Sequence, residues 1–150
     1  MPDKKAEQSG FILERTAKRM KQHIQQQLAA AAADITVDQW ILMQELEKTP
    51  GVSQLELARA TFKDAPTVTR IIDLLCAKGL ATRTPDPNDR RRFIIQLTPA
   101  GRQKIEAVLP IVKAARLKAW AGLDDRQMDQ LTEILNRVFE NLNPGDNGSM

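Results

Sequence analysis

The chain has 150 residues, 42% of them hydrophobic and 27% charged, which suffices for a sizeable core and excludes a mostly disordered chain or a collagen-like fibre. No apolar run approaches the roughly 20 residues of a membrane span, and the short run at 11–13 is followed at once by charges, unlike a secretory signal. One cysteine and one histidine exclude an internal disulfide and leave too few ligands for structural zinc, so we expect a cytoplasmic protein with no metal and no cofactor.

Positive charge is concentrated in the middle of the chain. Between Ser53 and Thr98 there are eight Lys and Arg residues and five Asp and Glu residues, so this segment carries the +3 net charge of the whole chain. A basic segment on an otherwise neutral chain is the expected footprint of a polyanionic partner.

A long amphipathic helix is predicted from about Ala6 to Ala33, where apolar residues recur at spacings of three and four. Phe11 and Ile12 lie off this stripe and form a second apolar patch. Two interpretations are open: the patch packs against a partner beyond the chain's own core, or the helix is buried on two sides within one chain. The stripe consists of Leu13, Ala17, Met20, Ile24, Leu28 and Ala31.

Two capping patterns predict the next two helices. Thr36 and Gln39 have capping-box spacing, and the helix that they begin ends before Pro50. Ser53 and the glutamate three residues later repeat the pattern, which predicts a short helix to about Ala60. The apolar side of this short helix consists of Leu55, Leu57, Ala58 and Ala60.

The fourth predicted helix has Asp64 as its cap and Pro66 in its first turn, where a missing amide donor does no harm. One face is apolar, formed by Val68, Ile71, Ile72 and Leu75. The opposite face carries Pro66, Thr69, Arg70, Asp73 and Ala77, with Thr67 on a flank. A face of small and polar side chains can lie against base edges without steric block.

Two short strands are predicted next, at about Ala81–Thr84 and Arg92–Thr98, joined by a connection at 85–91 that is rich in turn formers and then in cations. The second strand alternates toward the core at Phe93, Ile95 and Leu97. The three cations Arg90, Arg91 and Arg92 are open to a plainer interpretation as a merely solvated hairpin, but the turn residues before them favour a charged wing.

Two further helices complete the prediction. One begins at Pro99, and the last is capped by Asp124 together with Gln127. The last helix has an apolar seam that calls for another helix, formed by Met128, Leu131, Leu135, Val138 and Leu142. The tail at 143–150 is predicted to be disordered.

This order of elements predicts a mainly α fold with a small β-hairpin, a winged helix-turn-helix on a helical dimerisation platform. Residues 34–98 form the predicted winged region, and residues 6–33 with 99–142 form the dimerisation region. The Asp64 helix is expected to enter the major groove, and the hairpin arginines to reach the flanking backbone or a minor groove.

The wing sequence resembles a known family. Asp89-Arg90-Arg91, followed by Leu97-Thr98-Pro99-Ala100-Gly101, is similar to the Asp-x-Arg, Leu-Thr and Gly signature in the wing of the MarR family of bacterial transcription regulators. Pro66 to Arg70, and Leu75 to Leu80, resemble the family's recognition helix and its exit. The likeness covers about Ala6 to Leu142.

The resemblance implies a homodimer that binds double-stranded DNA, typically to repress genes, and that a small, often phenolic, anion releases. It implies that Asp89 orients Arg91, that Arg91 enters the minor groove with Arg90 beside it, and that the helix opened by Pro66 turns its outer face to the major groove. The residues expected at that groove are Thr67, Thr69 and Arg70.

A ligand site and a redox role are weaker expectations. His23, Trp40 and Met43 are candidate ligand contacts, although Trp40 and Met43 also fit a core role and His23 a plain exposed one. Some relatives sense oxidants through a cysteine near the amino end, whereas the cysteine here is Cys76, at a flank position that favours structural packing.

Two functions of different classes remain from the sequence. The first is a sequence-specific DNA-binding regulator without catalytic activity. The alternative is a helical protein-interaction module whose winged lobe does not bind DNA. An enzyme is the weakest option, because nothing in the sequence pairs a nucleophile with a base.

Overall fold

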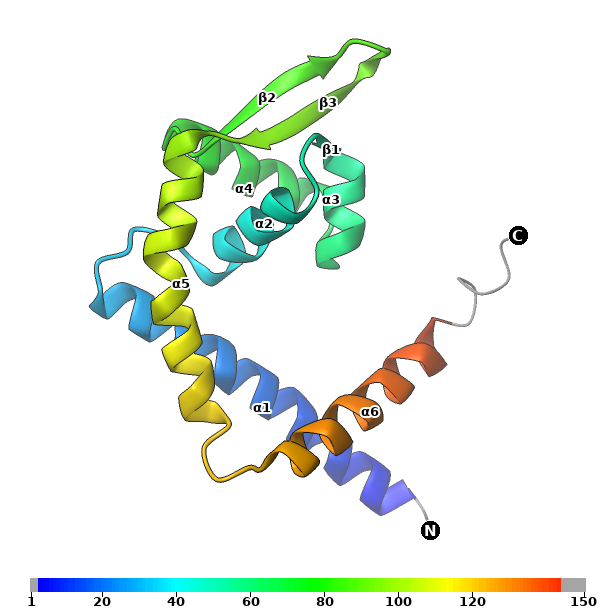
Figure 1. The fold of residues 1–150 in the computed structure, drawn as a ribbon. Coiled ribbons are helices and arrows are strands. Elements are labelled where there is room, and N and C mark those ends of the chain that lie inside the picture. Colours follow the sequence, from blue (N-terminus) through cyan, green and yellow to red (C-terminus); the bar gives the residue numbers. More distant parts are fainter. Residues whose placement is uncertain (1–2, 144–150) are drawn as a thin grey trace. The chain divides into compact units, whose positions relative to one another are not determined.

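The computed structural model describes residues 3–143, so the predicted disordered tail lies, apart from Asn143, outside the described residues. The fold is mainly helical with a small antiparallel sheet, as predicted (Figure 1). Its elements are α1 (Asp3–Ala30), α2 (Val37–Lys48), β1 (Val52–Ser53), α3 (Gln54–Thr61), α4 (Ala65–Ala77), β2 (Ala81–Asp86), β3 (Asp89–Leu97), α5 (Pro99–Ala119) and α6 (Asp125–Leu142).

The chain divides near the end of α5 into two compact units, Met1–Arg116 and Leu117–Met150. The first holds the winged region together with α1 and most of α5, and the second holds α6. No helix among residues 3–143 combines the length and the apolar character needed to cross a membrane.

Helix α2 is the centre of the core of the first unit. It contacts α1, α3, α4 and β3, so it is enclosed on several sides. Trp40 and Met43 of α2 are completely buried. The predicted capping box is present: the Thr36 hydroxyl accepts a hydrogen bond from the backbone N–H of Gln39, and the Gln39 side chain accepts one from the backbone N–H of Thr36.

The sheet has the order β1-β3-β2, with both pairs antiparallel. Strand β1 was not predicted, because two residues carry no periodicity, yet Val52 pairs with Ile95 of β3. The hairpin strands are longer than predicted, so Arg90 and Arg91 lie within β3 rather than in the connection. The reason is that the backbone ladder continues to the pair Asp86–Asp89 whatever side chains it carries.

Three expected core positions are exposed. Phe93 is 45% exposed and Leu55 58% exposed, and Ala60 also lies at the surface. Phe93 lies beyond the stretch of β3 that pairs with β1, where the hairpin projects from the helices (Figure 1). Apolar residues therefore keep their regular spacing along the strand and the short helix at positions that the core does not cover.

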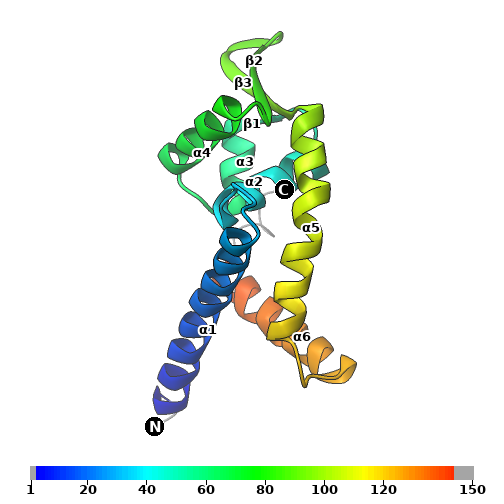
Figure 2. The same ribbon diagram turned by 90° about the vertical axis from the view of Figure 1, so that its left-hand side faces the viewer.

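The apolar stripe of α1 is buried only at Ile24 and Leu28, near its carboxyl end. That end packs on α2, while the rest of α1 runs away from the winged lobe (Figure 2). Phe11, Ile12 and Leu13 are exposed within this chain. Within the unit Met1–Arg116, nothing therefore buries α1 on a second side.

Helix α6 begins at the predicted cap, where Asp124 and Gln127 form a capping box. None of its residues is buried. The large apolar side chains exposed on α6 are Ile134, Leu135, Val138, Phe139 and Leu142. An apolar seam of this size is covered in most proteins by another helix.

Candidate nucleic-acid interface

The first turn of α4 is fixed by its cap. The Asp64 carboxylate accepts a hydrogen bond of 2.8 Å from the backbone N–H of Thr67, and this bond lowers the pKa of Asp64. Pro66 stands in the same turn, as predicted, where no amide donor is needed. The helix that the sequence assigns to the major groove thus begins at a defined residue.

The two faces of α4 are divided as the sequence predicts. The four apolar residues Val68, Ile71, Ile72 and Leu75 are buried in the core. Pro66, Thr69 and Arg70 are exposed, and Thr67 is half-buried. The exposed face therefore offers short polar side chains and one guanidinium to a partner.

The exit of α4 is closed by the predicted glycine. Gly79 adopts a positive φ of 73°, and the backbone N–H of Leu80 donates to the Leu75 carbonyl at 2.9 Å. Leu80 is buried, so the chain turns directly from α4 into β2.

A hydrogen bond between the side chains of α3 and α4 was not predicted. The Gln54 Nε2 donates to the Thr69 Oγ1 at 2.7 Å, and the Thr69 hydroxyl donates to the Ala65 carbonyl at 3.0 Å. The sequence gives no signal for the first contact, because Gln54 and Thr69 are 15 residues apart. The hydrogen bond from Gln54 fixes the side chain of Thr69 on the outer face of α4.

The tip of the wing is held by two aspartates. The Asp86 carboxylate accepts from the backbone N–H of Asn88 at 2.8 Å, and the Asp89 carboxylate accepts from the backbone N–H of Arg91 at 3.0 Å. Asp89 therefore contacts the main chain of Arg91, and the guanidinium is left to solvent. Both Arg90 and Arg91 are exposed.

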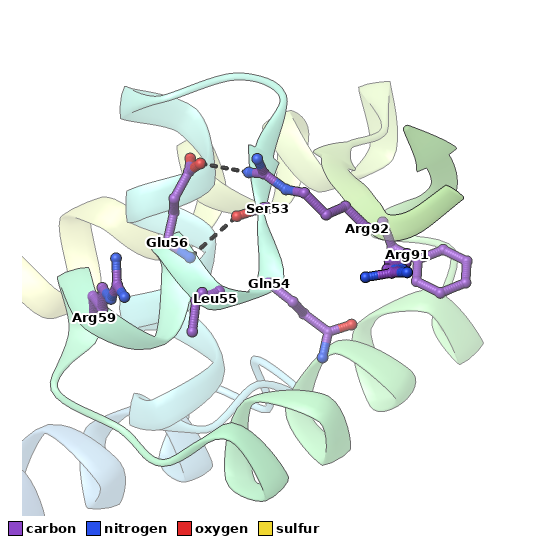
Figure 3. A pocket seen from close by; sticks show the side chains of 8 residues that line it. Ser53, Gln54, Leu55, Glu56, Arg59, Arg91 and Arg92 are labelled. Carbon is purple, nitrogen blue, oxygen red and sulfur yellow. Dashed lines mark hydrogen bonds and ion pairs between the residues drawn. The ribbon is translucent and has the colours of Figure 1, made fainter. Parts of the chain in front are cut away.

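The wing is tied to α3 by an ion pair. Arg92 Nη2 lies 2.6 Å from Glu56 Oε1, and this hydrogen bond lowers the pKa of Glu56 (Figure 3). Ser53 caps α3 by accepting a hydrogen bond from the backbone N–H of Glu56, and contacts with Ser53 add, less than Arg92 does, to the lowering of the Glu56 pKa. The Glu56 side chain pairs with Arg92, which gives the third arginine of the wing an anchoring role.

A hollow of about 480 Å³ lies between the start of α3 and β3 (Figure 3). It is lined by Ser53, Gln54, Leu55, Glu56, Arg59, Arg91, Arg92 and Phe93. Three of these residues are arginines, and the single carboxylate among them, Glu56, is paired with Arg92. The hollow is therefore basic and borders both the wing and the short helix that contacts α4.

Both ends of α4 are also tied to the junction between α1 and α2. Just before α4, Lys63 binds the Asp38 carboxylate at 2.7 Å, and Lys21 of α1 binds the same oxygen at 2.8 Å. At the other end, the Lys78 ammonium donates to the Asp34 carbonyl at 2.7 Å and to Gln39. These contacts fix the position of α4 relative to α1.

The Asp38 contacts predict an acid-dependent loss of stability. Partial burial acts to raise the pKa of Asp38, but hydrogen bonds and charges from Lys21 and Lys63 lower it below its ordinary value. A lowered folded-state pKa stabilises the fold above the ordinary pKa of about 3.9, and this contribution is lost as the pH falls through the folded-state value. Because these groups are partly exposed, we expect D38N to lower the free energy of unfolding at neutral pH by about 1 kcal/mol.

Urea unfolding at neutral pH and at about pH 2 checks this expectation. The difference in the free energy of unfolding between D38N and the wild type should vanish once Asp38 is protonated. D129N, an exposed aspartate of α6, is the matched control and should show no difference at neutral pH. Equal stability of D38N and wild type at neutral pH would contradict the role of this ion-pair cluster.

The candidate ligand residues do not form an open site. Trp40 and Met43 are completely buried in the core, and His23 is half-buried on α1. The indole Nε1 of Trp40 is buried and has no hydrogen-bond acceptor among the described residues. Residues 3–143 contain no group of three His, Cys, Asp or Glu side chains placed to hold a metal ion.

Cys76 is half-buried at the flank of α4. Burial is the largest influence on its thiol and raises the pKa of Cys76, while the charge of Arg83 acts in the opposite direction. A raised pKa means less thiolate at neutral pH and hence a less reactive side chain. This chemistry agrees with the structural role predicted for Cys76.

A short helix, a turn and a longer helix with an exposed polar face, backed by a sheet whose β2–β3 hairpin projects as a wing, define a winged helix-turn-helix protein. The exposed arginines of the wing and the outer face of α4 together form a polar, basic surface.

Comparisons with known proteins identify the family. A model of the MarR family matches residues 33–92. The chain is 28% identical over 134 residues to the HTH-type transcriptional repressor NicR of Pseudomonas putida, over 89% of this chain and 84% of NicR.

Two solved structures are similar to this chain, each with a TM-score of 0.80. Bordetella bronchiseptica BpsR, whose DNA binding is regulated by 6-hydroxynicotinic acid, is 27% identical over 87% of this chain and 98% of BpsR. The S. aureus MepR–DNA complex is 26% identical over 88% of this chain and 96% of MepR. The chain belongs to the MarR family.

Proposed function

We propose that the chain is a sequence-specific, DNA-binding transcription regulator that acts as a homodimer in the cytoplasm and has no catalytic activity. The observation that carries this proposal is the pair of contacts made by the start of α3. Gln54 binds Thr69 of α4, and Glu56 binds Arg92, the neighbour of Arg91 in the wing. The helix that offers its face to the major groove and the strand that carries the exposed arginines are thus held by one short helix.

Homodimer formation is supported by exposed apolar surface on α1 and α6. Phe11, Ile12 and Leu13 are exposed on α1, and no residue of α6 is buried. A second copy of the chain would cover such faces and set two winged lobes about one helical turn of DNA apart, near 34 Å.

Repression and release by a small aromatic anion are supported by the named relatives. NicR is a repressor, and the DNA binding of BpsR is regulated by 6-hydroxynicotinic acid, an aromatic carboxylic acid. The buried indole N–H of Trp40 is a donor that an acceptor atom of such a ligand would satisfy. In this proposal the ligand reaches the core side of α2 by displacing α1 or α2 rather than by filling an open hollow.

Selection of binding sites from random duplex DNA, followed by sequencing, tests the DNA-binding proposal. We expect a pseudo-palindrome with half-sites about 10 base pairs apart. Binding should also weaken steeply as salt rises, because bound phosphates release counterions. A protein that stays monomeric in sedimentation and ignores duplex DNA at low salt would contradict the proposal and favour the protein-interaction module.

A further inference from the structure

The contact between Gln54 and Thr69 joins the short helix α3 to the outer face of α4. Gln54 is the first residue of α3 and is half-buried. Thr69 is exposed on the face of α4 that is proposed to contact DNA. The bond of 2.7 Å between Nε2 and Oγ1 links the two helices directly through their side chains.

The Thr69 hydroxyl has one proton and can accept two hydrogen bonds. The proton is given to the Ala65 carbonyl, one turn earlier in α4, at 3.0 Å. One acceptor position is taken by Gln54. No donor remains on Thr69 for a guanine N7 or O6 or for a thymine O4, so only the γ-methyl group and one lone pair are available to a base edge.

The same contact fixes the rotamer of Thr69. A threonine in a helix divides between two χ1 rotamers, because its hydroxyl can bond to the preceding turn in either. Gln54 supplies a donor to the rotamer that is present, and this rotamer also decides where the methyl group lies. Without that donor, χ1 can rotate to the other rotamer at small cost, and the methyl group then takes a different position.

We propose that Gln54 is a positioning residue for base recognition: it holds Thr69 so that the γ-methyl group contacts the C5-methyl group of a thymine in each half-site. The inference rests on the proposed DNA-binding function and adds a base preference to it. The thymine methyl group is the major-groove feature that an apolar contact from threonine recognises.

Binding-site selection with variants of the full-length protein tests this inference. We expect Q54A to select the same pseudo-palindrome but to lose its thymine preference at one position of each half-site, by roughly five- to tenfold. Q54M, which keeps the length of the side chain without its donor, should behave in the same way. Q103A, an exposed glutamine of α5, is the matched control and should select the wild-type site.

Substitution by valine separates positioning from a direct contact. T69V places a methyl group at both γ positions, so its thymine preference should no longer depend on the rotamer. We expect the double variant Q54A/T69V to recover the preference that Q54A loses.

Two results would overturn the inference: an unchanged preference at every position in Q54A and Q54M, or a Q54A effect that persists in the T69V background and so reports a base contact by Gln54 itself. A wild-type protein that selects no site would refute the proposed function and this inference together. A wild-type site with unaltered variants would refute the inference alone.

Discussion

The Arg91→Ala protein is expected to bind its selected operator roughly 5- to 150-fold more weakly than the wild type, which corresponds to about 1–3 kcal/mol. Arg91 is exposed on β3, its backbone is held by Asp89, and its neighbour Arg92 is anchored to Glu56. A guanidinium presented in this way suits a narrow minor groove, where negative potential is concentrated. Titration of a labelled operator at several salt concentrations measures both the affinity and its salt dependence, which should become flatter.

Arg116→Ala is the matched control for this experiment. It removes the same charge from an exposed position on α5, away from the wing and α4, and should leave the affinity nearly unchanged. An Arg91→Ala protein with wild-type affinity and an unchanged salt slope would show that the wing does not contact DNA.

Replacing Gly101 by alanine should destabilise the fold by about 3 kcal/mol or more, because the added atom has no room. A Cβ at this position would lie 2.2 Å from the Leu80 carbonyl oxygen and 3.2 Å from Leu97 Cδ2. The Leu80 carbonyl cannot move freely, since it accepts a hydrogen bond of 3.0 Å from the backbone N–H of Thr98. Thermal unfolding should show a melting temperature lower by roughly 6–12 °C.

Gly10→Ala is the control of opposite sign. Gly10 lies inside α1, and a Cβ there would meet nothing within 4 Å. Alanine is the better helix former, so this change should stabilise the protein by about 0.5–1 kcal/mol. A Gly101→Ala protein as stable as the wild type would contradict the close contact between the exit of α4 and the start of α5.

The wing shows where prediction from the sequence succeeded and where it stopped. Turn formers and alternation correctly predicted a hairpin, but the boundaries of its strands were wrong. Arg90 and Arg91 lie in β3 because pairing with β2 continues beyond the sheet's contact with the core. Phe93 fits the alternating pattern and is nevertheless exposed, because it lies beyond the stretch of β3 that pairs with β1 and lines the open hollow beside α3.

The candidate interface shows the same division. The outer face of α4 and the cap at Asp64 could be predicted, because both depend on residues within one or two turns of helix. The ion pair between Glu56 and Arg92 could not be predicted, because the two residues are 36 positions apart. The Gln54–Thr69 contact could not be predicted either, because no local sequence pattern indicates it.

Local patterns in the sequence were enough to predict the number and type of the helices, their caps at Thr36, Asp64 and Asp124, and the glycine exit of α4. These features depend on hydrogen bonds and apolar spacings within a few residues, so local sequence patterns are enough to predict them. The three-dimensional fold was needed to show which apolar side chains are buried, which carboxylate pairs with Arg92, and why position 101 admits no side chain. Those outcomes depend on which distant segments meet, and the free energy that selects them comes from packing across the whole lobe.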